Sequence, residues 1–150
     1  MPHSFVCNYM HYVFSTKGRR PLITRDLRED LHLYIAGIAR NHSIDIKAIG
    51  GTDNHVHLLL SLPATITVAK AIQLIKGVSS KWAGEKIKAP KLFQWQEGYG
   101  AFGVGIAILN KTIDYIHNQE EHHKEKSFEE EFIGFLEKHD KPYDERYVWD

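Results

Sequence analysis

The pattern of hydrophobic and polar positions predicts three strands in the first 60 residues. Residues 6–15 are rich in Tyr, Val and Phe, and residues 44–49 alternate apolar with polar side chains, as strands of a partly buried sheet do. Residues 55–60 follow after the glycine-rich turn 50–54. The last two segments therefore predict a β-hairpin.

Helices are expected where apolar residues recur at steps of three and four. Four segments show this spacing: 25–41, 67–84, 105–122 and 127–138. Thr24 or Asp26 can cap the first of them, and Ser127 followed three residues later by Glu130 is a capping-box pattern at the start of the last. Residues 85–100 are basic and then aromatic, and they predict a loop or a short strand.

The order of these elements predicts the fold class. Strand, helix, two strands, helix, short strand and helix fit an α+β protein with a ferredoxin-like antiparallel sheet and helices packed on one face. No repeat or linker stands out, so we expect a single domain over residues 1–150, with an acidic C-terminal tail from about residue 139. The fourth strand has the weakest pattern.

Composition narrows the class of protein. Hydrophobic residues make up 43% of the chain and charged residues 25%, as in a soluble globular protein. No apolar run approaches the roughly 20 residues of a membrane helix, and the N-terminus lacks a signal pattern. We therefore expect a cytoplasmic protein without membrane association. The single cysteine, Cys7, has no internal disulfide partner, and we expect it to be a small packing residue.

The charge is distributed unevenly, although the formal net charge is zero. Residues 1–111 hold 14 Lys and Arg against 7 Asp and Glu, whereas residues 112–150 hold 5 against 12. A local basic surface can bind phosphates even when an acidic segment cancels the total, although a solvated lysine-rich helix would look the same. The candidate DNA-binding residues are Lys17, Arg19, Arg20, Lys76, Lys81 and Lys88.

The sharpest candidate for chemistry is the segment His55-Val56-His57. Residues i and i+2 of a strand point to the same face, so both imidazoles can meet one divalent ion. Asp53 or Asn54 could orient an imidazole through a hydrogen bond. Two histidines at this spacing are also common as structural residues. A cupin-type site would need a glutamate shortly downstream, and a two-histidine phosphoesterase would need a second His-x-Ser/Thr motif; both are absent from the sequence.

Tyr115 and Gln119 form a second candidate pair, at positions i and i+4 of one helix face. A phenol can attack a phosphodiester when a nearby metal ion activates it, and an amide oxygen can serve as a metal ligand. Three histidines are expected to point at least partly away from that face: His117, His122 and His123. Among the tyrosines, only Tyr115 has a ligand-type residue one helical turn away, so it is the first candidate for the nucleophile. Tyr99 is the second candidate.

Four motifs, taken in order, resemble the single-tyrosine HUH transposases of small bacterial insertion sequences, the IS200-like transposase family. They are HVHLLL at 55–60, IKGVSS at 75–80, WQEGYGAF at 95–102, and Tyr115-Ile-x-x-Gln-x-x-His-His ending at residue 123. The likeness runs from about residue 9 to residue 132.

The resemblance implies a homodimeric enzyme that binds hairpins in single-stranded DNA at the ends of a mobile element. It would cut and rejoin the DNA through a 5′-phosphotyrosine intermediate. His55 and His57 would be the metal pair, Gln119 the third ligand and Tyr115 the nucleophile, with Mg²⁺ or Mn²⁺ as the ion. We expect the dimer to continue the sheet through an edge strand, with the 6–15 or 55–60 strand as the candidate.

Two other functions remain open. A non-cutting nucleic-acid-binding regulator or domesticated relative would keep the binding surface, but the complete set of candidate ligands and nucleophile favours an enzyme. A phosphoesterase of small substrates has no need of the lysine-rich segment 70–91 followed by Phe93, Trp95 and Tyr99. Phosphate contacts and base stacking on such a surface favour a polymer.

Overall fold

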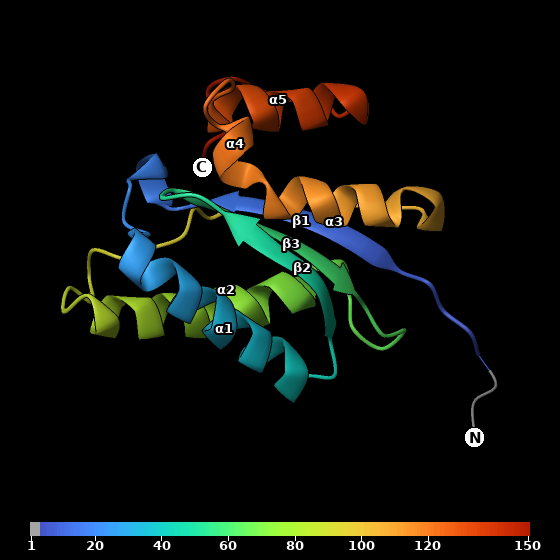
Figure 1. The fold of residues 1–150 in the computed structure, drawn as a ribbon, viewed down its shortest axis with the longest axis horizontal. Helices are drawn as coiled ribbons and strands as arrows, with labels where there is room; N and C mark the ends of the chain where they lie inside the picture. Colours follow the sequence, from blue (N-terminus) through green and yellow to red (C-terminus); the bar gives the residue numbers. More distant parts are fainter. Residues whose placement is uncertain (1–3) are drawn as a thin grey trace.

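A four-stranded antiparallel sheet lies at the centre of the structure, a computed structural model in which residues 4–150 are described (Figure 1). The strands are β1 (Tyr9–Ser15), β2 (Asp45–Gly51), β3 (His55–Ser61) and β4 (Gly100–Gly103). Their order is β2-β3-β1-β4. The α+β class, the ferredoxin-like sheet and the single domain are confirmed, and the weakly predicted fourth strand is a short edge strand.

Helices connect and flank these strands in the described part of the chain. The α-helices are α1 (Arg25–Asn41), α2 (Val68–Lys86), α3 (Leu109–His117), α4 (Gln119–His122) and α5 (Phe128–Lys138). Two short 3-10 helices are η1 (Lys17–Arg19) and η2 (Ile106–Ile108). Thr24 caps α1, and the capping box of Ser127 and Glu130 begins α5, as predicted. None of the described helices has the length and apolar character needed to cross a membrane.

Helices cover both faces of the sheet (Figure 1). α1 and α2 pack on one face, against side chains such as Tyr12, Phe14 and Leu58. α3 packs on the other face, where Ile116 meets Leu59, and α5 lies over the same side. The sequence predicted helices on one face, and α1 and α2 form that layer, whereas α3 to α5 cover the other face. The unbroken apolar run at 58–60 reflects this arrangement, because a strand buried on both faces has no polar side.

The helix predicted over 105–122 is divided into three pieces, η2, α3 and α4. α3 ends at His117 because Asn118 leaves the helical conformation, with φ −106° and ψ 30°. The Asn118 side chain donates to the Asp114 carbonyl at 2.8 Å, and the Asn118 amide donates to the same carbonyl at 3.2 Å. The break lets α4 turn away from α3, and it changes the direction in which the residues after Gln119 point.

Two predictions, one about Cys7 and one about the edge strands of the sheet, are wrong. Cys7 is exposed rather than packed, because residues 4–7 precede β1 and none of the described elements covers them. The 6–15 and 55–60 segments cannot lie at the sheet edge, because β1 and β3 are its two central strands. A dimer that continues the sheet would have to use β2 or β4 instead.

Candidate metal centre and nucleophile

His55 and His57 lie on β3 and point to the face covered by α3 to α5. Strand alternation sends Val56 and Leu58 to the opposite face, into the core beneath α1 and α2. Both imidazoles are completely buried, and their rings lie 5.1 Å apart between centroids. The predicted pairing of the two histidines on one face is what the structure shows.

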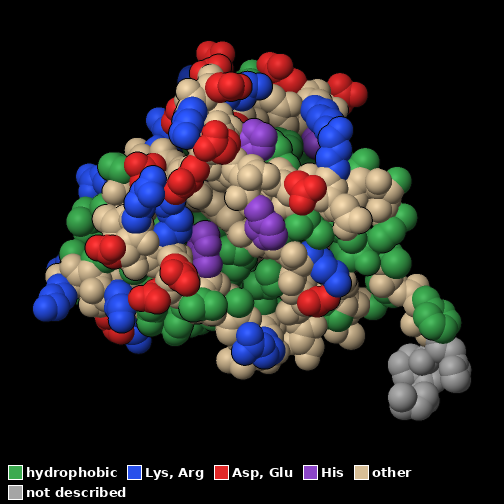
Figure 2. All heavy atoms as spheres, viewed as in Figure 1, with side chains coloured by type: hydrophobic (Ala, Val, Ile, Leu, Met, Phe, Trp, Pro, Cys, Tyr) green, Lys and Arg blue, Asp and Glu red, His purple; other side chains and the backbone are tan. Residues whose placement is uncertain are grey.

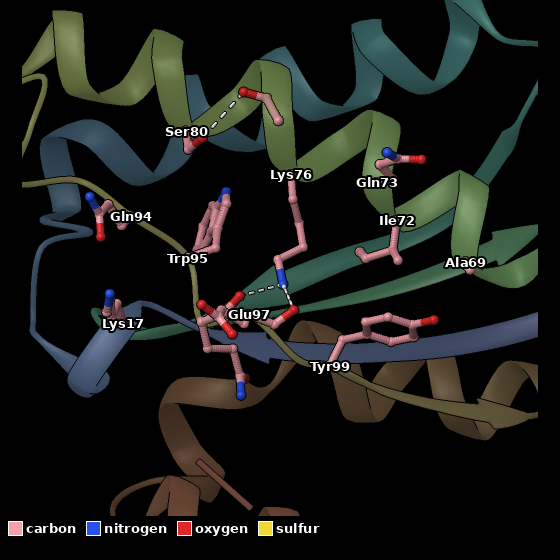
Figure 3. A pocket seen from close by; sticks show the side chains of 12 residues that line it. Lys17, Ala69, Ile72, Gln73, Lys76, Ser80, Gln94, Trp95, Glu97 and Tyr99 are labelled. Atoms are coloured by element: carbon pink, nitrogen blue, oxygen red, sulfur yellow. Dashed lines mark hydrogen bonds between the residues drawn. The ribbon is translucent and has the colours of Figure 1, made fainter. Parts of the chain in front are cut away.

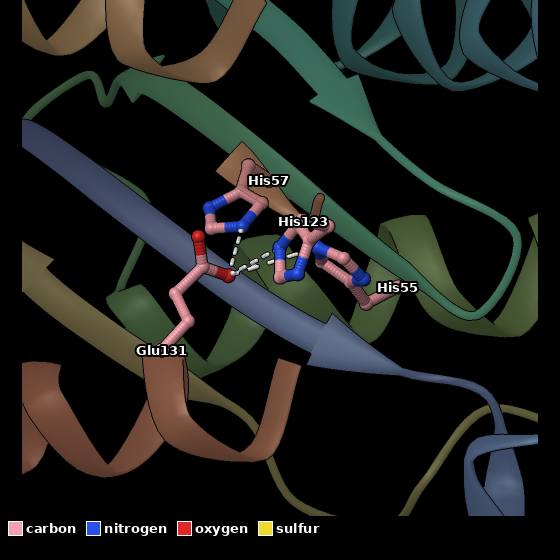
Figure 4. A group of neighbouring side chains, drawn as sticks. All are labelled: His55, His57, His123 and Glu131. Carbon is pink, nitrogen blue, oxygen red and sulfur yellow. Dashed lines mark hydrogen bonds and ion pairs between the residues drawn. The ribbon is translucent and has the colours of Figure 1, made fainter. Parts of the chain in front are cut away.

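Side chains from α4 and α5, and from the residue after α4, converge on the two Nε2 atoms. His55 Nε2 lies 3.1 Å from Gln119 Oε1, and His57 Nε2 lies 2.9 Å from Glu131 Oε1. His123 Nε2 lies 3.1 Å from Gln119 Oε1 and 3.2 Å from Glu131 Oε1. One ligand atom from each of His55, His57, His123 and Glu131 falls within 4.8 Å of the others (Figure 4).

Hydrogen bonds at the Nδ1 atoms of His55 and His57 bear on the tautomers of the two rings. His57 Nδ1 lies 2.7 Å from Nε2 of His11, and His55 Nδ1 lies 2.8 Å from Oδ1 of Asn54. The Asn54 oxygen can only accept, so His55 carries its proton on Nδ1 and leaves the Nε2 lone pair facing the cluster. If His57 donates its Nδ1 proton to His11, its Nε2 lone pair faces the Glu131 carboxylate at 2.9 Å, a contact between two acceptors that a bound cation would satisfy. Asn54 therefore supplies the orienting hydrogen bond that the sequence suggested.

Burial keeps the imidazoles of His11 and His55 neutral. Desolvation, reinforced by the neighbouring His57, lowers the pKa of His11 and that of His55 from 6.5 to about 3. Desolvation also acts to lower the pKa of His123, but the hydrogen bond and charge of Glu131 outweigh it and raise that pKa. Burial opposes ionisation of Glu131, yet its bonds to His123 and His57 prevail and hold its pKa far below the usual range.

These protonation states make the cluster suited to a cation. Gln119 Nε2 donates to the Tyr115 carbonyl at 3.2 Å, which turns Gln119 Oε1 toward the unprotonated Nε2 of His55. Two acceptors thus face each other, and they repel unless a positive charge binds both lone pairs. Neutral imidazoles, an ionised carboxylate and an amide oxygen are all donors to divalent metal ions. The residues fit a bound metal ion on this ground.

Tyr115 lies beside the cluster, near the end of α3. Its hydroxyl donates to Oε2 of Glu131, and its ring stacks on His122 at 4.4 Å between centroids. Burial and the Glu131 carboxylate raise the pKa of the phenol above its usual value. The phenol is half-buried at the wall of a cavity of about 370 Å³, which Lys111, Lys126 and Lys138 also line.

His123 and Glu131 are the two residues that the sequence reasoning missed. His123 was expected to point partly away, but the break at Asn118 turns it into the cluster. Glu131 carries a sequence signal: it follows Phe128 by three residues on the apolar stripe of α5, where an ionisable side chain is buried. An acid in such a position needs buried partners.

The predicted DNA-binding residues fall into two groups. Lys76 and Arg19 already have partners within the chain. The Lys76 ammonium donates to the carbonyls of Gln96 at 2.5 Å and of Gly98 at 2.9 Å, and burial lowers its pKa to about 8 (Figure 3). Arg19 pairs with Glu129 at 2.9 Å and lies over the Trp149 ring at 4.8 Å. Both side chains therefore stabilise loops as well as adding positive charge.

Of the exposed members, Lys17 and Arg20 line a groove on the α2 side of the molecule. A cavity of about 510 Å³ between α2 and the 94–99 loop includes Lys17 (Figure 3). A second cavity shares Lys17 and Gln94 and adds Arg20 and Lys91. Lys81 and Lys88 are exposed on α2 and just after it. The groove ends at the turn that follows β1, where Ser15 pairs with His55.

The class of protein follows from comparison with known families. The chain matches the family described as "Transposase IS200 like" over residues 4–119, and it belongs to that family. The match includes His55, His57, Tyr115 and Gln119 and ends before His123 and Glu131. A search among curated proteins gave no significant match.

Two solved structures share the fold. A candidate transposase from Deinococcus radiodurans R1 is 20% identical with a TM-score of 0.63, over 78% of this chain and 97% of that one. A REP-associated tyrosine transposase, solved bound to a REP hairpin, is 18% identical with a TM-score of 0.56. That likeness covers 77% of this chain and 68% of the other.

Proposed function

We propose that this chain cuts and rejoins single-stranded DNA at hairpin-bearing ends, with Tyr115 as the nucleophile. The observation that carries the proposal is the position of the Tyr115 hydroxyl. It donates to the Glu131 carboxylate, and the other oxygen of that carboxylate contacts His57 of the buried histidine pair. Membership of the transposase family supports DNA as the substrate. The hairpin bound to the structural neighbour suggests the DNA form.

In the proposed reaction the phenol oxygen of Tyr115 attacks a backbone phosphorus. The bond from phosphorus to the 3′ oxygen breaks, and the products are a 5′-phosphotyrosine and a free 3′-hydroxyl. Rejoining is the reverse attack by a 3′-hydroxyl, which releases Tyr115. A Mg²⁺ or Mn²⁺ ion held by His55, His57 and Gln119 would neutralise charge on the phosphate and orient it. His55, His57 and Gln119 are buried. Their burial would exclude water from the ion and favour attack by the phenol over hydrolysis.

The charge around Tyr115 supports a phosphate substrate. Lys111, Lys126 and Lys138 line the cavity in front of the phenol, and all three are exposed. Lys126 and Lys138 lie in the segment that is acidic overall, and Lys111 directly precedes it, so the folded chain gathers positive charge where the linear sequence does not. Their ammonium groups would attract the DNA backbone toward the nucleophile.

The DNA would reach this site around the end of the sheet. The groove containing Lys17, Arg20 and Lys91 ends at the turn after β1. The amide of Thr16 in that turn donates to the Asn54 carbonyl at 2.9 Å, next to His55. A strand bound in the groove would therefore continue past the turn toward the metal ligands. We also propose that the protein is a homodimer, and that it acts in the cytoplasm where its DNA substrate lies.

The decisive experiment is incubation with hairpin-bearing single-stranded DNA and a divalent ion, followed by denaturing electrophoresis. We expect a protein–DNA band that resists denaturation and disappears with a chelator. Hairpin binding without any covalent band, across Mg²⁺ and Mn²⁺, would contradict the proposal and favour the non-cutting regulator.

A further inference from the structure

The carboxylate of Glu131 connects the nucleophile to the histidine cluster. Its Oε1 atom lies 2.9 Å from His57 Nε2, 3.2 Å from His123 Nε2 and 3.7 Å from His55 Nε2. Its Oε2 atom accepts the hydrogen bond of Tyr115. The two oxygens of one side chain thus face different parts of the candidate active site.

Glu131 is placed for this role by α5 rather than by the sheet. Phe128 and Phe132 of the same helix pack into the hydrophobic cluster with Val13 and Phe102, and Phe128 stacks on the His55 ring at 4.6 Å. This packing leaves the Glu131 side chain 3% exposed. A buried carboxylate is costly unless charged or hydrogen-bonding partners compensate it. Here its described partners are three imidazoles and the phenol, which is an unusual set for a structural acid.

The distances also suit a single ion. Ligand atoms about 2.1 Å from one metal lie roughly 3 to 4.2 Å from each other in common coordination geometries. The measured separations of Glu131 Oε1 from the three Nε2 atoms fall at or close to this range. All four ligand atoms lie within 4.8 Å of one another, so small shifts would complete a coordination shell (Figure 4).

We propose that Glu131, through Oε1, and His123 join His55, His57 and Gln119 as ligands of the metal ion, and that Glu131 holds the Tyr115 hydroxyl beside the ion through Oε2. The carboxylate would then set the separation between the nucleophile and the metal. This inference rests on the proposed function only in taking Tyr115 as the nucleophile. The metal-binding part stands on the geometry of the cluster alone.

The ligand set predicts which ion binds. Three imidazole nitrogens and one carboxylate suit first-row transition-metal ions, whereas Mg²⁺ prefers oxygen ligands and retains several waters. We therefore expect Mn²⁺ to bind the DNA-free protein at least about tenfold more tightly than Mg²⁺. Pulsed electron paramagnetic resonance of bound Mn²⁺ should count three imidazole nitrogens.

The test compares Glu131→Gln with Glu137→Gln, the same change at an exposed position of the same helix. Calorimetric titration of the DNA-free proteins with Mn²⁺ should show at least about a tenfold loss of affinity for Glu131→Gln and none for Glu137→Gln. At saturating Mn²⁺, Glu131→Gln should also form the covalent adduct at least about tenfold more slowly in a single turnover. Its hairpin affinity should be unchanged.

Several outcomes would overturn the inference. Unchanged Mn²⁺ affinity in Glu131→Gln, a count of two imidazoles, or equal binding of Mg²⁺ and Mn²⁺ would each do so. If Glu131→Gln does not fold, Glu131→Asp decides, because it keeps the charge but withdraws the oxygens by one methylene and should still lose affinity. Metal binding as expected without any adduct in the wild type would leave the ligand set intact and contradict the proposed function instead.

Discussion

Nδ1 of His57 lies 2.7 Å from Nε2 of His11, so a histidine of β1 orients a candidate metal ligand of β3. Both rings are buried, and burial lowers the pKa of His11 to about 3, which keeps it a neutral acceptor. Such supporting hydrogen bonds fix the tautomer of a metal-binding imidazole. His11 was placed in the first strand by the sequence, without any assigned role.

We expect His11→Leu to weaken Mn²⁺ binding by about 10- to 100-fold, because it removes the acceptor that holds the proton on His57 Nδ1. His11→Gln supplies an amide oxygen in nearly the same place and should retain affinity within a few-fold. Calorimetry on both variants separates the hydrogen bond from simple packing. Equal losses in the two would show that His11 acts only by filling space.

Tyr115→Phe should abolish the covalent DNA adduct while leaving hairpin affinity and the melting temperature nearly unchanged. Only the hydroxyl is lost, and the ring that stacks on His122 remains. Tyr99→Phe is the matched control. Tyr99, the second candidate nucleophile, lines the groove beside α2 and packs toward Tyr12 on the opposite face of the sheet. An adduct that survives in Tyr115→Phe and disappears in Tyr99→Phe would reverse the assignment.

Charge removal in the turn after β1 should reduce the salt dependence of DNA binding. The double variant Lys17→Gln/Arg20→Gln should flatten the log–log salt slope by about 1.4, since each phosphate contact to a single strand contributes roughly 0.7. Lys47→Gln is the control, because Lys47 pairs with Asp45 at 2.7 Å on β2, away from the groove. A slope equal to that of the wild type would place the DNA elsewhere, with Lys81 and Lys88 as the next pair to test.

Acid should destabilise the protein partly through His32 of α1. Burial, with the charge of Arg28, lowers the pKa of His32 from 6.5 to about 4. The folded state therefore binds fewer protons, so the contribution is fully present above pH 6.5 and is lost as the pH falls toward 4. The loss is at most about 3 kcal/mol. Urea unfolding at pH 7 and pH 4.5 should show a smaller difference for His32→Gln than for the wild type, and an equal difference would contradict this.

The dimer is expected to form through β4. β4 ends the sheet, and Ile106 and Ile108, which follow it, are 70% and 48% exposed. Hydrophobic side chains gather at the end of the molecule where α3 begins (Figure 2). Ile106→Asp/Ile108→Asp should convert a dimer to a monomer in light scattering at micromolar concentration. A wild-type protein that is already monomeric and still forms the adduct would rule out a required dimer.

The sequence by itself determined the first three strands, the helices over 25–41 and 127–138, and the position of the histidine pair. These follow from local causes: alternation in strands, helical spacing, and caps such as Thr24 and Ser127. The pair His55 and His57 shares a face because strand geometry requires it. That Tyr115 lies next to this pair was predicted only from the order of the motifs. In the folded chain, Tyr115 is connected to the pair through its hydrogen bond to Glu131.

Only the tertiary structure decided which further side chains reach the cluster. A one-residue departure from helical geometry at Asn118 turns His123 inward, and the packing of Phe128 and Phe132 carries Glu131 beneath the histidines. Which strands lie at the edge also depended on pairing between segments far apart in the chain, and local pattern says nothing about pairing order. Long-range packing therefore decided which side chains reach the cluster and which strands lie at the edge, because both depend on elements that meet only in the folded chain.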